Sequence, residues 1–407
     1  MAEMNAAERF ALIKENLQEI LNPDIIEGIL AEGRNPKVYW GTSPTGKPHC
    51  GYFVPAVKIA QLLAAGCDVT ILIADIHGFL DNLKAPIELV EYRAKYYEYT
   101  IRAMLQAVGV STEKLRFVLG SSYQKSPEYV MDVYKLCSLV SEHDAKKAGA
   151  EVVKQSNNSP LSGLLYPILQ VLDEQHLDCD VQFGGVDQRK LFAASTEWQP
   201  KLGYRKRAHL LNPMVPGLTG GKMSSSEEGT VDFPYLYEQL TDFVESKIDL
   251  LEAADTVRKK IRKAQAAPKE IENNGVLSFA EFVLLPASAL KTGRPEFRVS
   301  RERDGLEPLV YTDIKQMQED YKNDILSPQL LKPAVAEALV ELMAPIITAF
   351  EESKEWQEVT LKAYPPLEKK KKEKKQKDKG NRYPGAKTAE TAELPLRETG
   401  VQEPTVN

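Results

Sequence analysis

The chain has 407 residues, of which 43% are hydrophobic and 27% are charged. These fractions are typical of soluble globular proteins, so they exclude a fully disordered chain and allow two or three domains. The four cysteines form no C-x-x-C pair, which excludes a zinc ribbon and a disulfide scaffold and favours a reducing compartment.

The net charge of −6 is unevenly distributed. Segment 369–379 reads KKKKEKKQKDK and carries +6, with eight lysines against Glu373 and Asp378, so the remaining residues carry −12. Such a tail would raise phosphate affinity, support a nuclear pool, or simply stay solvated and disordered. The chain has no uncharged run near the ~18 residues of a membrane span, and its N-terminus is too acidic for a leader. We therefore expect a cytoplasmic protein without a membrane partner.

The first half of the chain predicts a βαβ pattern. Apolar residues at helical spacing predict a helix over 8–21 and another after Pro23. Strands are predicted at 38–42 and 69–75, with a helix over 51–65 between them. Two strands joined in this way should be parallel, with a right-handed connection.

Further along the chain, helices and short strands continue to alternate. We predict a helix over 87–108, a strand at 116–120, helices within 127–177 broken by a polar loop at 155–160, a strand at 181–185 and a helix opening at 186. From about 245 the pattern is mainly helical, which indicates a second domain.

Segment 39–52, YWGTSPTGKPHCGY, places a glycine-containing loop between a strand and a helix. Gly41 and Gly46 let the backbone approach a ligand, and His49 falls at the helix N-terminus, where unpaired N–H groups favour phosphates. The spacing fits neither the dinucleotide nor the P-loop fingerprint. An ordinary turn with a surface histidine is the alternative.

A second glycine-rich segment, 217–226, reads GLTGGKMSSS. The ammonium of Lys222 would neutralise a polyphosphate, and the serine hydroxyls would bind its oxygens. By itself such a segment is equally typical of a linker. Its combination with the first motif favours a nucleotide site.

Tyr166, Gln170 and Asp173 are spaced so that they share one face of a helix. Their neighbours are apolar, and burying unpaired polar groups is costly, so the stripe predicts a ligand site. A solvent-facing stripe is the alternative. No metal-ligand spacing links His77, His143 and His176, and we expect each to have a satisfied structural role.

These motifs resemble those of class I aminoacyl-tRNA synthetases. PTGKPHCGY is similar to their HIGH motif and Lys222-Met223-Ser224-Ser225-Ser226 to KMSKS, although Tyr52 replaces the second histidine and Ser225 the usual lysine. Segments such as KVYWGT, KKAGAEVVKQ and QFGGVDQRK make residues 8–364 similar to the eukaryotic cytosolic tyrosine branch, and KGNRYPGA in the tail resembles fungal members.

The resemblance implies a fold and a domain order. The fold class would be α/β, with a Rossmann-type parallel-sheet catalytic domain over 1–228 and a dimer-forming helical insertion near 120–165. A mainly α-helical anticodon-binding domain would cover 245–364, and a disordered Lys-rich tail 365–407. Residues 229–244 interrupt the family pattern, and we interpret them either as an added helix or as a gene-model error such as an unspliced intron.

The resemblance also implies an activity and a set of site residues. The chain would be a tyrosine–tRNA ligase (EC 6.1.1.1) whose substrates are tyrosine, ATP with Mg²⁺, and tRNA(Tyr). It would hold no metal through its own side chains and would act as a homodimer. Its catalytic residues would be His49, Lys222, Ser224 and Ser225. Its tyrosine pocket would comprise Tyr39, Tyr166, Gln170, Asp173 and Gln188. ATP would contact Gly41, Thr42, Gly46, His49, Gly184, Asp187, Lys222, Met223 and Ser224. Candidate tRNA contacts are Lys146, Lys147, Lys154, Arg258, Lys259 and Lys260.

Three alternatives stay open at this point. An acid facing the ring of the substrate suits a phenol, but an indole also offers an N–H donor, so tryptophan is a close rival. A protein that kept the fold but binds RNA without catalysis is a second alternative, and a nucleotidyltransferase acting on another substrate is a third.

Overall fold

The structure is a computed structural model that describes residues 4–81, 87–112, 115–153, 160–218 and 247–365. Residues 1–365 form one compact unit and 366–407 a second, which lies outside the described residues. The segment from Lys222 to Ser226, whose catalytic role is a prediction, also falls outside them, as do segment 229–244, Lys154 and the Lys-rich tail. The predicted boundaries at 228 and 245 therefore remain predictions.

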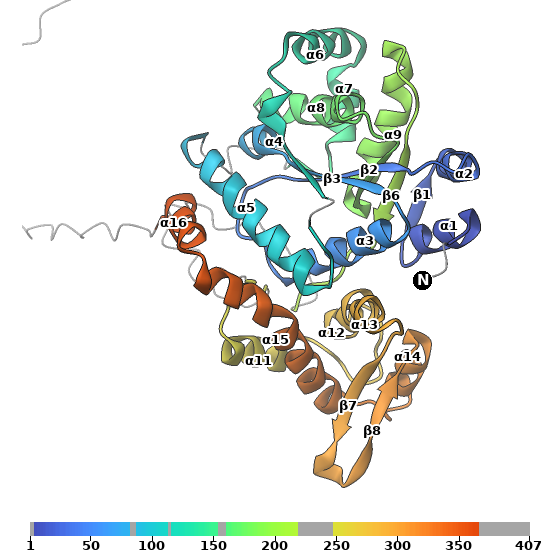
Figure 1. Ribbon diagram of the computed structural model, residues 1–407, viewed down its shortest axis with the longest axis vertical. Coiled ribbons are helices and arrows are strands. Elements are labelled where there is room, and N and C mark those ends of the chain that lie inside the picture. Colours follow the sequence, from blue (N-terminus) through green and yellow to red (C-terminus); the bar gives the residue numbers. More distant parts are fainter. Residues whose placement is uncertain (1–3, 82–86, 113–114, 154–159, 219–246, 366–407) are drawn as a thin grey trace, which may run out of the picture. The chain divides into compact units, whose positions relative to one another are not determined.

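A six-stranded sheet forms the centre of the N-terminal part, in the order β1-β6-β5-β2-β3-β4 (Figure 1). Its strands are β1 (Glu19–Leu21), β2 (Lys37–Thr42), β3 (Asp68–Ile73), β4 (Arg116–Leu119), β5 (Val181–Gly185) and β6 (Ala208–Asn212). β2 to β6 run parallel, and β1 pairs antiparallel with β6 at the edge. The predicted α/β class and the parallel βαβ unit are confirmed.

The order of the strands reverses between β2 and β5. From β2 the chain builds outward through β3 to β4, whereas β5 and β6 extend the sheet on the other side. Doubly wound sheets bind ligands at such a switch point, beyond the carboxyl ends of the strands. A ligand site is therefore expected at the carboxyl ends of β2 and β5.

Helices cover both faces of the sheet, with α3 and α5 on one side and α8 and α9 on the other (Figure 1). The helices of this part are α1 (Ala6–Lys14), α2 (Pro23–Ala31), α3 (Phe53–Ala64), α4 (Asp75–Leu80), α5 (Ile87–Ala107), α6 (Pro127–Leu139), α7 (Glu142–Ala148), α8 (Ser162–His176) and α9 (Arg189–Trp198). Short 3₁₀ turns lie at Cys50–Tyr52, Gly120–Ser122, Val186–Gln188 and Gln199–Leu202. One apolar core underlies α3 and α5, and a second joins α6, α8 and α9.

Two sequence predictions in this part need correction. The helix expected over 8–21 ends at Lys14, because Asn16 adopts a left-handed φ of 57° that turns the chain toward β1. The strand β6 was not predicted. Its residues are all buried, so it lacks the alternating pattern that marks a half-exposed strand.

The C-terminal part is mainly helical, as predicted, but contains an antiparallel hairpin that the sequence analysis missed. The helices are α11 (Ala254–Lys263), α12 (Gly275–Phe279), a π-helical turn (Ala280–Leu284), α13 (Leu285–Thr292), α14 (Ile314–Lys322), α15 (Pro328–Glu352) and α16 (Lys354–Ala363). The hairpin joins β7 (Phe297–Arg301) to β8 (Leu306–Tyr311) through a 3₁₀ turn (Glu302–Asp304). α15 and α16 pack against α5 (Figure 1).

Two helical stretches of this part, Gly275–Thr292 and Pro328–Glu352, are long and apolar enough to cross a membrane by length and composition alone. The share buried inside the fold is 56% for the first and 33% for the second. Core helices of soluble proteins pass the same test, so these stretches are weak evidence for a membrane.

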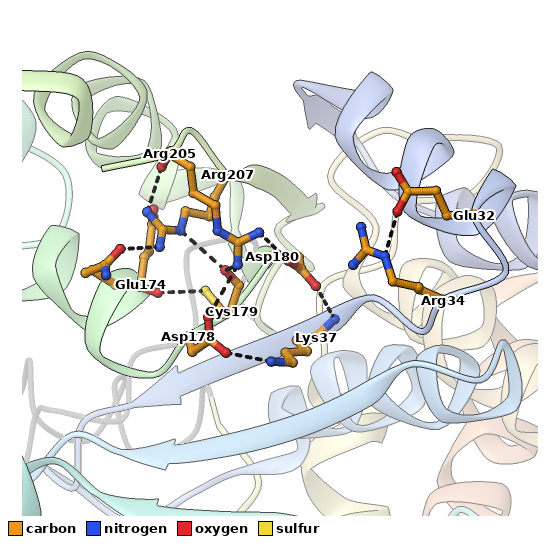
Figure 2. A network of polar contacts seen from close by, with 10 residues as sticks. Glu32, Arg34, Lys37, Glu174, Asp178, Cys179, Asp180, Arg205 and Arg207 are labelled. Carbon is orange, nitrogen blue, oxygen red and sulfur yellow. Dashed lines mark hydrogen bonds and ion pairs between the residues drawn. The ribbon is translucent and has the colours of Figure 1, made fainter. Parts of the chain in front are cut away.

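At the amino ends of β2 and β5, a polar network fastens the chain that enters β5 (Figure 2). Lys37 pairs with Asp178 at 2.6 Å, and its backbone N–H donates to Asp180 at 2.9 Å. The buried guanidinium of Arg207 donates to the carbonyl of Cys179 and to Gln175. The network therefore ties the C-terminal end of α8 to the sheet, which restrains the helix that carries Asp173.

Candidate functional site

A cavity of about 390 Å³ opens at the switch point between β2 and β5. Ten of the residues that the sequence predicted for the site line it: Tyr39, Gly41, Thr42, His49, Tyr166, Gln170, Asp173, Gly184, Asp187 and Gln188. They come from β2, the loop that follows it, α8, the end of β5 and the 3₁₀ turn Val186–Gln188. The topology thus gathers residues that lie up to about 150 positions apart in the sequence into one cavity.

α8 presents its polar stripe to this cavity, as predicted. Tyr166, Gln170 and Asp173 all line the cavity from one helix face. Gln170 donates to the side-chain oxygen of Gln188 at 2.9 Å, and the Tyr166 hydroxyl lies 3.4 Å from the Ser43 hydroxyl. The alternative of a solvent-facing stripe is therefore wrong.

Asp173 is fully buried, and its two carboxylate oxygens have different surroundings. Oδ1 accepts hydrogen bonds from Tyr123, Gln124 and Tyr129 at 2.7, 2.8 and 2.9 Å. Oδ2 has no hydrogen-bond partner. Burial raises the pKa of Asp173 to about 7, and the three donors oppose this rise.

The hydroxyl of Tyr39 is a second buried polar atom in the cavity without a hydrogen-bond partner. Burial, with the nearby charge of Asp173, raises the pKa of Tyr39 well above its usual value, so the hydroxyl keeps its proton. A buried donor and a buried acceptor left unpaired in one cavity are costly to the fold, and a ligand hydroxyl would satisfy both.

His77, on α4, is not the satisfied structural histidine that we expected. Both of its ring nitrogens are buried without a hydrogen-bond partner, and its ring meets that of Tyr166 edge-on at 4.7 Å. Burial lowers its pKa to about 4, so the ring is neutral at physiological pH. His176 does fit the expectation, since its Nε2 lies 3.1 Å from Asp132, and His143 is exposed.

His49 caps the turn that precedes α3. Its Nδ1 accepts from the backbone N–H of Gly51 at 3.1 Å, so a neutral ring carries its proton on Nε2. Burial, with the positive charge of Lys247, lowers the pKa of His49 to about 4. The backbone N–H of Cys50 donates to the carbonyl of Ile248 at 2.8 Å. The segment that begins at residue 247 therefore lies against this turn.

The loop between β2 and His49 is held from outside the cavity. Arg93 donates to the carbonyl of Thr45 at 2.6 Å, and the hydroxyls of Tyr97 and Tyr364 donate to that of Gly46 at 2.6 and 3.0 Å. Gly46, predicted to contact ATP, is not among the residues that line the cavity in the described part of the chain. Its carbonyl instead anchors the loop.

Gly184 and Gly185 at the end of β5 are required by close packing. A Cβ on Gly184 would lie 2.8 Å from Phe192 and 3.1 Å from Gln188, and one on Gly185 would lie 2.6 Å from the carboxylate of Asp187. Glycine therefore lets the backbone lie close to the side chains of Phe192, Gln188 and Asp187.

Sequence reasoning missed several polar residues of this cavity, notably Asp81 and Gln182. Gln182 carried a signal, because it is the polar side chain in the otherwise apolar strand β5, and its Oε1 has no hydrogen-bond partner. Asp81 follows α4 with no helical or strand spacing to mark it.

The candidate tRNA contacts lie elsewhere on the surface. Lys146 and Lys147 are exposed on α7, where Lys146 pairs with Glu142. On α11, Arg258 pairs with Glu337 and Asp255, and Lys260 is mostly buried against Glu252, which leaves Lys259 exposed. Within the described part of the chain, no group of three metal-ligating side chains comes together.

Comparisons with known proteins identify the family of the chain. The family model described as tRNA synthetases class I (W and Y) matches residues 31–344. The cytoplasmic tyrosine–tRNA ligase of Saccharomyces cerevisiae is 51% identical over 404 residues, 98% of each chain. That of Danio rerio is 52% identical over 363 residues, which cover 89% of this chain and 64% of the relative. A solved tyrosyl-tRNA synthetase of Archaeoglobus fulgidus, complexed with L-tyrosine, superposes with a TM-score of 0.74 at 30% identity, over 85% of this chain and 99% of its own.

The chain therefore belongs to the class I tRNA synthetases that serve tryptophan and tyrosine. Within that class it belongs to the cytoplasmic tyrosine–tRNA ligases (EC 6.1.1.1), enzymes that use ATP. This membership excludes the alternative that the amino-acid substrate is tryptophan.

Proposed function

We propose that the cavity between β2 and β5 holds tyrosine beside ATP and joins them as tyrosyl-adenylate, before the amino acid passes to the 3′ end of tRNA(Tyr). The observation that carries the proposal is the pair of unpartnered atoms, the Tyr39 hydroxyl and Asp173 Oδ2. A phenol would accept from the first and donate to the second. Phenylalanine would leave both unpaired, so the site selects against it.

The amino-acid end of the substrate would lie one to two helical turns away along α8. Tyr166 and Gln170 would hold the ammonium, with Gln188 fixed by its hydrogen bond to Gln170. Asp81 lines the same cavity, where burial raises the pKa of Tyr166 and the charge of Asp81 adds to that rise. It would supply a counter-charge for the ammonium.

ATP would occupy the end of the cavity formed by the strand ends and His49. Gly41, Thr42, Gly184 and Asp187 would contact the nucleoside, and the Nε2–H of neutral His49 would donate to phosphate oxygens. Lys222, Met223, Ser224 and Ser225 would complete the phosphate site. Mg²⁺ would come bound to the phosphates and offset their charge.

The first step needs little acid–base chemistry from the protein. The tyrosine carboxylate attacks the α-phosphorus, a new C–O–P link forms, and pyrophosphate leaves with the electrons of the broken P–O bond. In the second step a ribose hydroxyl of the tRNA attacks the tyrosyl carbonyl carbon, the bond from that carbon to the phosphate oxygen breaks, and AMP leaves as the hydroxyl proton passes to its phosphate. Positioning and stabilisation of the charge that develops on phosphate should supply most of the rate enhancement.

We also propose that the enzyme is a homodimer joined through α6. This helix exposes Met131, Tyr134 and Leu139, which are 52%, 64% and 47% accessible. Large apolar side chains gathered on one surface helix are typical of an interface.

Lys146, Lys147, Lys154 and the basic residues of α11 would contact tRNA phosphates, although Arg258 and Lys260 would first have to leave acidic partners.

The test is amino-acid-dependent ATP–pyrophosphate exchange on the full chain, with tyrosine, tryptophan and phenylalanine compared. Exchange with tyrosine alone is expected. Exchange with tryptophan, or none from a folded protein, would overturn the proposed chemistry.

Sedimentation of Tyr134→Glu against the natural chain tests the dimer, since a charge on that face should give monomers.

A further inference from the structure

Asp173 is held by three donors that do not themselves line the cavity. The hydroxyl of Tyr123, the amide of Gln124 and the hydroxyl of Tyr129 all approach Oδ1, within 2.9 Å. They come from the turn after β4 and from α6, and among the described residues none of them is part of the cavity wall. Any influence they have on a ligand must pass through Asp173.

We propose that Tyr123, Gln124 and Tyr129 are positioning residues that keep Asp173 as an anion with Oδ2 alone directed to the substrate phenol, and thereby set the preference for tyrosine over phenylalanine. The inference rests on the proposed function of the cavity. It assigns to a second layer of residues a role in choosing the amino acid.

The physical reason is that a carboxylate buried away from water needs compensation. Burial raises the pKa of Asp173 to about 7, and the donors from Gln124, Tyr123 and Tyr129 act against that rise, while the charge of Glu174 adds to it. A hydrogen bond to the charged form favours it. With the donors in place the pKa of about 7 leaves the carboxyl about half ionised at neutral pH, so without them the protonated form would predominate there. A protonated acid accepts the phenol poorly.

The other groups that face Asp173 do not provide this compensation. His77 Nε2 lies 3.8 Å from Oδ2, beyond hydrogen-bond distance, and its pKa of about 4 leaves it neutral. Tyr39 keeps its proton, and its hydroxyl has no partner in the cavity. Glu174, the next residue of α8, adds negative charge and is engaged by His209 and Ser195 at 2.9 and 2.6 Å.

The geometry also explains why one oxygen stays available. With three donors gathered on Oδ1, the rotation of the carboxylate is restrained and Oδ2 remains without a protein partner. Gly120 permits this arrangement, because a Cβ there would lie 2.8 Å from Gln124 Oε1 and displace the amide. The preorganised acceptor then meets the phenol without rearrangement.

Tyr123→Phe is the sharpest test, since it removes one oxygen atom whose partner is Asp173. Tyr129→Phe is less clean, because the Tyr129 hydroxyl also contacts the carbonyl of Leu169 at 2.8 Å. Tyr204→Phe is the matched control. It removes a tyrosine hydroxyl that donates to another aspartate, Asp132, outside the cavity.

The measurement is the KM for tyrosine in pyrophosphate exchange between pH 5.5 and 9, with phenylalanine as competitor and thermal unfolding alongside. As the pH falls, Asp173 takes up a proton and the KM for tyrosine rises. For Tyr123→Phe we expect this rise to begin at a higher pH than in the natural chain. Because the movement starts from a pKa of about 7, one unit corresponds to a KM about five-fold higher at pH 7, with kcat at saturating tyrosine retained. Selectivity over phenylalanine should fall by a similar factor at neutral pH and recover at alkaline pH, whereas Tyr204→Phe should match the natural chain.

Two outcomes would overturn the inference while leaving the proposed function intact. In the first, Tyr123→Phe and Tyr129→Phe give the same pH profile as the natural chain. In the second, KM rises equally at every pH in step with a lower melting temperature, as a merely structural role predicts. Failure of the natural chain itself to exchange with tyrosine would instead overturn the proposed function.

Discussion

The hydroxyl of Tyr364 donates a hydrogen bond of 3.0 Å to the carbonyl of Gly46, across 318 residues of sequence. Tyr364 lies just beyond α16, and Gly46 lies in the loop that leads to His49. Arg93 supports the same junction, since it donates both to Thr45 and to the carbonyl of Ala363. The end of the described chain therefore fastens the loop that we propose to hold the ATP phosphates.

Tyr364→Phe should loosen that loop without unfolding the protein. The carbonyl of Gly46 keeps its hydrogen bond from Tyr97, so it is not left unpaired, and the loss should be about 1 kcal/mol. We expect the KM for ATP to rise about five-fold while the KM for tyrosine changes little. Tyr321→Phe is the control, because it removes a similar bond from a tyrosine hydroxyl to the carbonyl of Ala267, away from the cavity. Equal changes in both KM values would contradict this expectation.

Tyr39→Phe should separate stability from substrate binding. The hydroxyl of Tyr39 is buried without a partner in the free protein, so removing it should leave the free energy of unfolding unchanged or raise it slightly. The phenol of tyrosine would lose one hydrogen bond, and the KM for tyrosine should rise by a factor of about five. Thermal unfolding and pyrophosphate exchange on the same preparation provide the check. A clear loss of stability would mean that the hydroxyl has a partner in the free state.

His49 predicts a specific pH dependence of stability. Its pKa is about 4 in the folded protein, against a usual value of 6.5, so the unfolded chain binds the extra proton first as the pH falls. The contribution is complete above pH 6.5 and is lost progressively between about 6.5 and 4, at up to about 1.4 kcal/mol per pH unit.

The variant His49→Asn isolates this effect, because asparagine keeps an oxygen that accepts from Gly51 but does not titrate. The difference in unfolding free energy between the natural chain and the variant should shrink as the pH falls through that window. A difference that is flat with pH would show that His49 titrates normally.

Gly275 and Gly28 offer opposite outcomes for the same substitution. A Cβ on Gly275 would lie 2.7 and 2.8 Å from the carbonyl oxygens of Pro216 and Gly217, so the backbone must shift. Gly275→Ala should cost about 2 kcal/mol, the range expected for overpacking. Gly28 lies inside α2 with nothing within 4 Å of a Cβ, and Gly28→Ala should stabilise the fold by about 0.5–1 kcal/mol. Denaturant unfolding of both variants measures the change in the free energy of unfolding, which should be a loss for Gly275→Ala and a gain for Gly28→Ala. Equal changes would refute the packing argument.

Local sequence patterns were enough to predict most of the elements and many of the residues that line the cavity. The helical spacing of Tyr166, Gln170 and Asp173 and the loop that leads to His49 are local patterns, because they depend on the period of a helix and on the chemistry of a turn. The strands β2, β3 and β5 could be predicted for the same reason. Apolar β-branched runs bounded by turns carry their own signal.

Which buried polar atoms have hydrogen-bond partners depends on the packing of distant segments. Tyr123 and Tyr129 reach Asp173 because α6 and the turn after β4 pack against α8, a contact between segments about 45 residues apart that no local period encodes. His77 looked like an ordinary core histidine until the fold left both of its nitrogens unpaired. Asn16 ended the first helix by its backbone conformation, and β6 was hidden because full burial removes alternation. Hydrogen-bond satisfaction depends on where distant segments meet, so it is a property of the packed fold rather than of the sequence pattern.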